Sequence, residues 1–132
     1  MSIALFFADL GVAVKGQEWP LGGISNIDGS VFLLVWKSEI KKRDGHTWAY
    51  LGETDVKEKQ SSAIRQRDSH IRLLKSGRRG FLLFGQPVVN LSGKREVGAF
   101  DAERIFPVGD IVTRDGGIWA QFLTGIPVRQ FF

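Results

Sequence analysis

Continuous apolar runs indicate the buried strands of this chain. The run Ile3 to Phe7 predicts a first buried strand, and Ser30 to Trp36 predicts a second that continues into residues 37–43. A third run lies in Gly80 to Val89, where Pro87 indicates a sheet edge or a bulge. Apolar runs of four to eight residues with turn residues at their ends are typical of strands covered on both faces.

Alternating positions follow the second run and predict a β-hairpin. Asp44-Gly45 is a preferred pair for a two-residue type I′ turn, and 46–53 is the returning strand. This turn fixes the register of the two strands. The predicted pairs are Arg43 with His46, Lys41 with Trp48, Glu39 with Tyr50, and Lys37 with Gly52.

A helical period replaces the strand pattern at about 55–76. Asp55 and Glu58 have the spacing of a capping box, and Gly77 is a typical residue just after a helix. Arg67 lies within the apolar stripe of this helix and therefore needs a partner, while His70 borders the stripe.

The last third of the chain predicts further strands. We expect an extended segment at 97–106 that Pro107 ends, a hairpin of 110–114 with 118–123 around Asp115-Gly116-Gly117, and a closing strand at 128–132. The fold class is therefore α+β. We expect a single domain over 1–132, with a mostly antiparallel curled sheet or small β-barrel of about seven strands and one main helix.

The charge of the chain is concentrated in its middle third. The net charge is +4, but residues 37–79 hold 12 Lys and Arg against 6 Asp and Glu, and the remainder holds 6 against 8. A localised basic region is expected of a protein that contacts phosphate backbones, and equally of a merely soluble basic surface. The chain has no Cys, which excludes disulfides and thiolate metal sites.

The hairpin register places cations and aromatic rings together. One face carries Lys37, Glu39, Lys41, Arg43, His46, Trp48 and Tyr50. Cations neutralise phosphates, and aromatic rings stack on bases. A two-stranded ribbon also fits the DNA major groove. The alternative is that Trp48 and Tyr50 pack under another element with lysine stems across them.

Other basic residues extend this hypothesis. The candidate phosphate contacts outside the hairpin are Arg65, Arg72, Arg78, Arg79, Lys94 and Arg95. Trp19, in a Gly-rich loop region, is a candidate pocket wall or an anchor of that loop on the core.

Catalytic signals are weak. Asp28 and Glu39-Ile40-Lys41 resemble the spaced Asp, Glu-x-Lys pattern of metal-dependent nucleases. In one extended strand, however, the two carboxylates would lie roughly 36 Å apart. Phosphate-binding glycine loops and nucleophile elbows are not found in the sequence. We therefore expect no catalytic residue, no cofactor and no metal.

The outline of the chain resembles the PUA-like group, which includes the EVE and ASCH domains. The resemblance rests on SVFLLVW, the helix ending LLKSG, and the strand GFLLFG. It implies a small curved β-barrel that binds RNA or reads a modified base in DNA, often beside a nuclease domain in restriction systems.

These observations predict a cytoplasmic nucleic-acid-binding domain, with DNA favoured over RNA, and no membrane association. A homodimer or an attached catalytic domain stays open. Two other functions also stay open: a protein-interaction or oligomerisation module that uses the same aromatic ribbon, and the nuclease of Asp28, Glu39 and Lys41.

Overall fold

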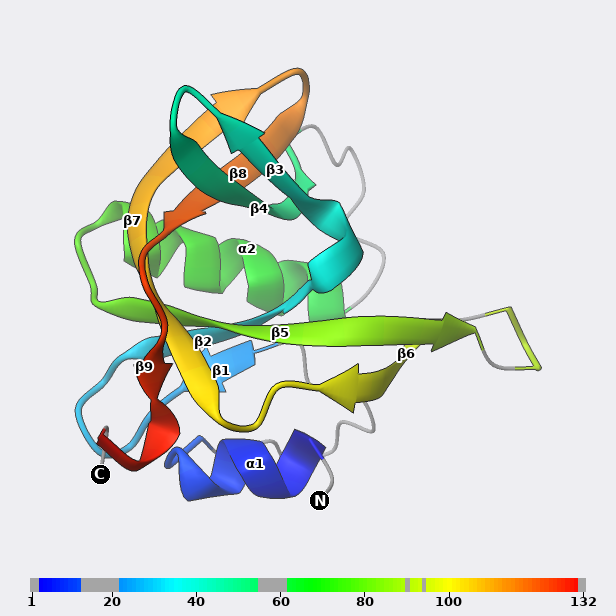
Figure 1. The fold of residues 1–132 in the computed structure, drawn as a ribbon, viewed down its shortest axis with the longest axis vertical. Helices are drawn as coiled ribbons and strands as arrows, with labels where there is room; N and C mark the ends of the chain where they lie inside the picture. Colours follow the sequence, from blue (N-terminus) through cyan, green and yellow to red (C-terminus); the bar gives the residue numbers. More distant parts are fainter. Residues whose placement is uncertain (1–2, 13–21, 55–61, 90, 94, 131–132) are drawn as a thin grey trace.

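The fold was analysed in a computed structural model that describes residues 3–12, 22–54, 62–89, 91–93 and 95–130. Within these ranges the chain is α+β, with one main helix and a mixed sheet of nine strands (Figure 1). The helices are α1 (Ile3–Asp9) and α2 (Ser62–Lys75), with short 3₁₀ turns η1 (Lys37–Glu39) and η2 (Val128–Gln130). The strands are β1 (Gly22–Ile24), β2 (Val31–Trp36), β3 (Ile40–Arg43), β4 (His46–Glu53), β5 (Gly80–Val89), β6 (Arg95–Phe100), β7 (Arg104–Arg114), β8 (Gly117–Phe122) and β9 (Ile126–Pro127).

The centre of the molecule is the parallel pair β2 and β5, which we call the central layer. Val31 pairs with Gly80 and Trp36 with Gly85. Alternate residues of both strands enter two separate cores, one against α1 and one against α2 and the inner face of β4 and β8. Because both faces are covered where the two strands pair, residues 31–36 and 80–85 are apolar or Gly at every position, as is typical of parallel sheets. The two predicted buried strands are therefore confirmed.

The remaining strands place the sheet edges. The order is β1-β2-β5-β7-β8-β4-β3, with β6 added to β5 and β9 added to β7. The predicted small barrel is wrong for the described residues, because the two ends of this path do not pair and the sheet stays open. The expected antiparallel sheet is also mixed, because β2 and β5 run parallel after a crossover through β3, β4 and α2.

The N-terminal strand prediction is wrong, because residues Ile3–Asp9 form α1. The buried residues Ile3, Phe6, Phe7 and Leu10 repeat at helical spacing, and Leu5 points to solvent. The helix packs its apolar side on Phe32, Leu34, Phe81 and Leu83 of the central layer. An apolar run this short fits a strand and a helix equally well, and the tertiary contacts decide between them.

Two expected strands also differ from the prediction. The strand that was expected to continue through residues 37–43 is interrupted by η1, so the predicted pairs Glu39–Tyr50 and Lys37–Gly52 do not form. Pro107 does not end a strand but lies inside β7, where it pairs with Phe81, and its carbonyl accepts a hydrogen bond from the Leu123 amide. In the expected closing strand, residues Val128–Gln130 form η2 instead. The β5–β6 register shifts between Gly85 and Pro87, so the bulge expected at Pro87 is confirmed.

The main helix is confirmed over Ser62–Lys75. Its proposed cap, Asp55 with Glu58, lies outside the described residues. At the other end Gly77 has φ +99°, and the amides of Gly77 and Arg78 donate to the carbonyls of Leu74 and Leu73. Glycine ends the helix here because it adopts positive φ without a steric penalty.

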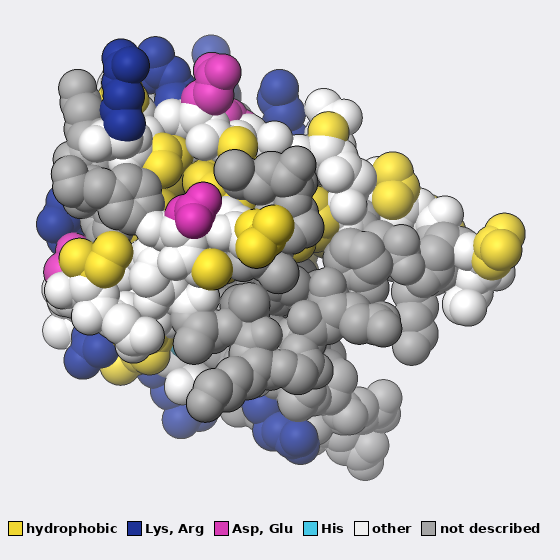
Figure 2. Space-filling model, turned by 90° about the horizontal axis from the view of Figure 1, so that it is seen from below, with side chains coloured by type: hydrophobic (Ala, Val, Ile, Leu, Met, Phe, Trp, Pro, Cys, Tyr) yellow, Lys and Arg dark blue, Asp and Glu magenta, His cyan; other side chains and the backbone are white. Residues whose placement is uncertain are grey.

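A hairpin of β5 and β6 projects from the body (Figure 1). Val88, Val89 and Leu91 are exposed along it, and hydrophobic side chains are seen at the right-hand end of the face drawn in Figure 2. The same view shows Lys and Arg side chains around the margins of the molecule.

Candidate functional site

The Asp44-Gly45 hairpin has the predicted register. Arg43 pairs with His46 and Lys41 with Trp48. Asp44 and Gly45 have φ values of +54° and +77°, the left-handed conformation that a type I′ turn requires at both central residues. The shared face of Lys41, Arg43, His46, Trp48 and Tyr50 follows from this register.

The hairpin is not an isolated ribbon, because β8 pairs with the other edge of β4. Trp48 lies opposite Gln121 and Tyr50 opposite Trp119. Beyond β8, Val112 of β7 lies opposite Trp119. The face therefore spans four strands. We call it the ring face, defined by Lys41, Arg43, His46, Trp48, Tyr50, Val112, Arg114, Trp119 and Gln121.

The opposite face of these strands is core. Ala49, Leu51, Ile118 and Ala120 are buried in the same cluster as residues of α2. Because side chains alternate along a strand, the ring face points away from α2. Trp48 and Tyr50 are half-buried and are not sealed in the interior.

The ring face is concave. Lys41 and Arg43 of β3 and Arg114 of β7 line one small cavity of about 50 Å³ together with Trp48 and Trp119. Strands β4 and β8 lie between β3 and β7 in the sheet order. Side chains from the two outer strands meet only if the sheet curls toward this face, as Figure 1 shows for β3, β4, β7 and β8.

A larger cavity lies on the same concave face, toward the β7–β8 turn. Its volume is about 320 Å³, and its lining comprises Lys41, Tyr50, Glu53, Thr54, Arg114, Asp115, Gly116, Gly117 and Trp119. Lys41, Arg114, Asp115 and Trp119 border both cavities. Trp119 therefore stands at the junction of the two.

Aromatic contacts hold the rings in place. The Tyr50 and Trp119 ring centroids are 5.2 Å apart in an edge-to-face arrangement. The Lys41 ammonium lies 5.3 Å from the Trp119 ring centroid, within the range of a cation–π contact. Burial, with the negative charges of Glu53 and Glu39, raises the pKa of the Tyr50 phenol, which stays a neutral donor at physiological pH. The buried indole nitrogen of Trp48 has no hydrogen-bond partner among the described residues.

The larger cavity depends on a residue without a side chain. A Cβ at Gly117 would lie 2.9 Å from Tyr50 Cε1 and 3.1 Å from Trp119 Nε1. The Thr54 amide and hydroxyl both donate to the Gly116 carbonyl, at 2.9 and 3.1 Å. These bonds tie the end of β4 to the β7–β8 turn and fix the mouth of the cavity.

Three of the predicted basic residues, one in η1 and two on α2, lie away from the ring face. Lys37 is exposed in η1, outside the β3–β4 pairing. Arg65 and Arg72 are exposed on α2, which packs on the opposite side of the sheet, and Arg72 forms an ion pair with Asp68 at 3.1 Å. The structure does not bring these three residues together with Trp48 and Tyr50.

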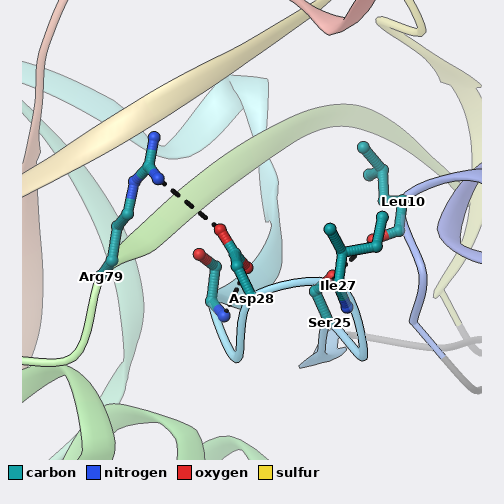
Figure 3. A network of polar contacts seen from close by, with 6 residues as sticks. Leu10, Ser25, Ile27, Asp28 and Arg79 are labelled. Carbon is teal, nitrogen blue, oxygen red and sulfur yellow. Dashed lines mark hydrogen bonds and ion pairs between the residues drawn. The ribbon is translucent and has the colours of Figure 1, made fainter. Parts of the chain in front are cut away.

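The structure does not place the remaining predicted residues on the ring face either. Arg78 is exposed after α2. Arg79 forms an ion pair with Asp28 at 3.6 Å (Figure 3). Its guanidinium also lies over the Phe81 ring. Trp19 and Lys94 lie outside the described residues, and for Arg95 the structure gives only its backbone position at the start of β6.

The nuclease hypothesis receives no support from the geometry. Asp28 precedes β2 and Glu39 follows it, so the six residues of β2, which span roughly 16 Å at about 3.3 Å per step, separate the two carboxylates. Burial favours a higher pKa for Asp28, but the Ser30 amide and the Arg79 guanidinium outweigh it and hold that pKa below its usual value. Within the described ranges, no three His, Asp or Glu side chains gather as a metal site would require.

Arg67 has the partner that its position in the apolar stripe requires. Its guanidinium donates to the Leu34 carbonyl at 2.6 Å, one residue beyond the last pair of β1 with β2. Burial lowers the pKa of Arg67 to about 10. Burial and the Arg67 charge together lower the pKa of His70. Both residues lie where α2 packs on the central layer.

The sequence analysis did not include Arg114, Glu53, Thr54 or Trp119 among the candidate site residues. The Asp115-Gly116 turn pairs Arg114 with Gly117 and so places Arg114 with Val112 and Trp119 on one face. The Asp115-Gly116 turn, which sets this register, could be read from the sequence. No local sequence pattern predicts the pairing of β8 with β4, which joins this face to that of the first hairpin.

No family model, curated protein or solved structure matched this chain. Among the described helices, none combines the length and the apolar character that a membrane crossing needs.

Proposed function

We propose that this protein binds nucleic acid through the ring face, without catalysing a reaction. The observation that carries the proposal is the convergence of Lys41, Arg43 and Arg114 from two outer strands on the rings of Trp48 and Trp119. DNA is the first ligand to test. A more specific form of the same proposal is that the protein recognises a modified base in DNA as part of a restriction system.

The charges of the ring face suit a phosphate backbone. Lys41 and Arg43 are exposed, and Arg114 is half-buried beside them. Each cation that neutralises a phosphate releases condensed counterions, so binding weakens as salt rises. The chain as a whole carries net charge +4, which favours the encounter with a polyanion.

The aromatic rings supply the second contribution. A base that stacks on Trp119 must displace the Lys41 ammonium from that ring. An exposed cation–π contact is worth roughly 0.5–1 kcal/mol, whereas stacking a base on an aromatic side chain is worth roughly 1–3 kcal/mol. The exchange therefore favours the base, and it frees the ammonium to contact a phosphate.

The test compares charge reversals on the two faces of one strand. Lys41→Glu changes the ring face, while Lys42→Glu makes the same charge change on the exposed neighbour that points the other way. We expect fluorescence anisotropy with labelled DNA to show at least a tenfold larger loss for Lys41→Glu. We also expect affinity to fall steeply with salt, with a slope near −0.7 per phosphate contact for single strands.

Two outcomes overturn the proposal. Equal effects of Lys41→Glu and Lys42→Glu would show that the ring face makes no specific contact. Affinity independent of salt, or no binding at low salt, would remove the phosphate contacts and favour a protein partner for the same rings, which also suit protein interfaces.

A further inference from the structure

We infer that the larger cavity beside Trp119 takes one unpaired base that carries an exocyclic amino group, with its phosphate on the side of the smaller cavity. This inference rests on the proposed function and specifies the ligand of the same site. Its observations are the width and curvature of the ring face and the uneven division of charge between the two cavities.

The width of the ring face excludes the groove-binding mode that the sequence suggested. Four strands about 4.8 Å apart span roughly 14 Å before side chains are added, whereas the DNA major groove is about 12 Å wide. Because β4 is paired on both edges, the hairpin does not enter a groove as a two-stranded ribbon. The rings also stand in a hollow, where they are reached by a base that has left its helix and not by one stacked within a duplex.

The two cavities differ in charge. The smaller one is lined by the cations Lys41, Arg43 and Arg114 and by a single carboxylate, Asp115. In the larger one, Lys41 and Arg114 are balanced by Asp115 and Glu53. An anion is therefore favoured in the smaller cavity, and a neutral group is favoured in the larger one. A nucleotide has both parts, a charged phosphate and a neutral base.

The polar lining of the larger cavity selects among bases. Asp115 and Glu53 present carboxylate oxygens, which only accept hydrogen bonds. The Thr54 hydroxyl already donates its proton to the Gly116 carbonyl and so offers its lone pairs to a ligand. Cytosine, adenine and guanine carry an amino group that donates to such acceptors, whereas uracil presents a carbonyl oxygen at the position of the cytosine amino group.

The arrangement of the rings agrees with this assignment. Tyr50 and Trp119 meet edge to face at one wall of the larger cavity, and Gly117 leaves the space beside them open. A flat base enters with its face on Trp119 and its edge toward Glu53 and Asp115. Its phosphate then lies toward Arg43, on the smaller-cavity side of Trp119.

The experiment measures anisotropy with oligodeoxycytidine and oligodeoxyuridine of equal length, and with a mixed-sequence duplex. Cytosine and uracil have nearly the same shape, so their difference isolates the amino group. We expect the deoxycytidine strand to bind about 10-fold more tightly than the deoxyuridine strand, within the range of one specific base contact. The duplex should bind more weakly than either strand at equal salt.

Matched variants locate the preference. Glu53→Gln and Asp115→Asn each replace a carboxylate by an amide, and Asn keeps the turn at residue 115, whose φ is +52°, because it tolerates positive φ. We expect the pair of substitutions to abolish the cytosine preference while the deoxyuridine strand binds as well or better. Trp119→Leu should weaken both single strands at least fivefold, in line with the loss of one stacking contact.

The outcomes separate the inference from the function on which it rests. Equal, salt-dependent binding of both strands, or preference for the duplex, overturns the inference and leaves a nucleic-acid-binding surface. A cytosine preference that survives the double substitution overturns the assignment of Glu53 and Asp115. No salt-dependent binding of any nucleic acid overturns both proposals.

Discussion

The central layer and the ring face both contain aromatic side chains, but these are buried in the first and partly exposed in the second. In β2 and β5, Phe32, Leu34, Phe81 and Leu83 are almost fully buried against α1, and the alternate residues are buried against α2 and β4. In β4 and β8, the described residues cover only one face. Ala49 and Ala120 are buried, whereas Trp48 and Trp119 stay half-exposed on the other face.

The difference shows what an uncovered sheet face makes available. In a strand that is covered on both sides, every side chain is buried and contributes to stability, so the sequence is apolar throughout. A strand covered on one side keeps alternation, and its outer positions are free to carry rings beside cations. The position of α2 decides which face of β4 remains open, because its residues Ile71 and Leu74 cover the other.

The largest expected effect is in the central layer. Phe32 is fully buried and its ring stacks on that of Phe81, with centroids 5.2 Å apart. Phe32→Ala should lower the free energy of unfolding by about 3–5 kcal/mol, because a large cavity remains. Trp119→Ala should cost less than half as much in urea unfolding. Equal losses would contradict the distinction between the two regions.

Gly117→Ala should act on the ring face with a smaller effect on stability. The added Cβ would press on the Tyr50 and Trp119 rings and narrow the larger cavity without removing any contact group. We expect about a fivefold or greater loss of single-strand affinity, comparable to the loss of one stacked base. A matched Gly29→Asn substitution, at a glycine of φ +78° that lies in the turn before β2 and has open space around it, should retain binding, because Asn tolerates positive φ. Unchanged affinity for Gly117→Ala would show that the cavity does not receive the ligand.

The pH dependence of stability should come from the central layer, where α2 packs. Burial and the Arg67 charge hold the pKa of His70 below its ordinary value of 6.5. Below pH 6.5 the unfolded state therefore binds a proton that the folded state does not, and stability falls as pH drops toward the folded pKa. His70→Gln should flatten this dependence in urea unfolding between pH 7 and 5, roughly the interval in which histidine titrates. An unchanged slope would mean that His70 is not held neutral.

The smallest effect is expected at the turn before β2. Asp28→Asn keeps an acceptor for the Ser30 amide but removes the charge that faces Arg79 (Figure 3). The pair is partly exposed, so we expect a loss of less than about 1 kcal/mol. Because the pKa of Asp28 is lowered from 3.8, its contribution is present above pH 3.8 and is lost as pH falls through the lower folded value. A small difference in thermal unfolding near neutrality that shrinks as the pH is lowered below 3.8 would fit this account, and a difference that does not change with pH would contradict it.

Local patterns predicted much of the fold. The two Asp-Gly turns, the buried runs of β2 and β5, the main helix and its Gly77 end all follow from residues that are near one another in the chain. The failures have local causes as well. The run Ile3–Phe7 is compatible with a helix and with a strand. The sequence of residues 37–39 contains no signal for the 3₁₀ turn that separates β2 from β3.

The sequence predicted the hairpin part of the candidate site correctly but added helix residues that lie elsewhere. The pairing rule around Asp44-Gly45 placed Lys41, Arg43, His46, Trp48 and Tyr50 on one face, as the structure has them. The basic residues of α2 were grouped with them because the sequence shows charge but not which side of a sheet a helix covers. Their separation from the ring face follows from the packing of α2 on the inner face.

Residues close together in the chain specify the two tight turns, the register beside them and the alternation that places rings and cations on one face, because each of these depends on backbone conformations and spacings within a few residues. The tertiary structure alone decided the parallel pairing of β2 with β5, the pairing of β4 with β8 and the curl that brings Lys41 and Arg114 to Trp119. Those arrangements join residues tens of positions apart. They are selected by the burial of whole faces against one another, which no short stretch of sequence specifies.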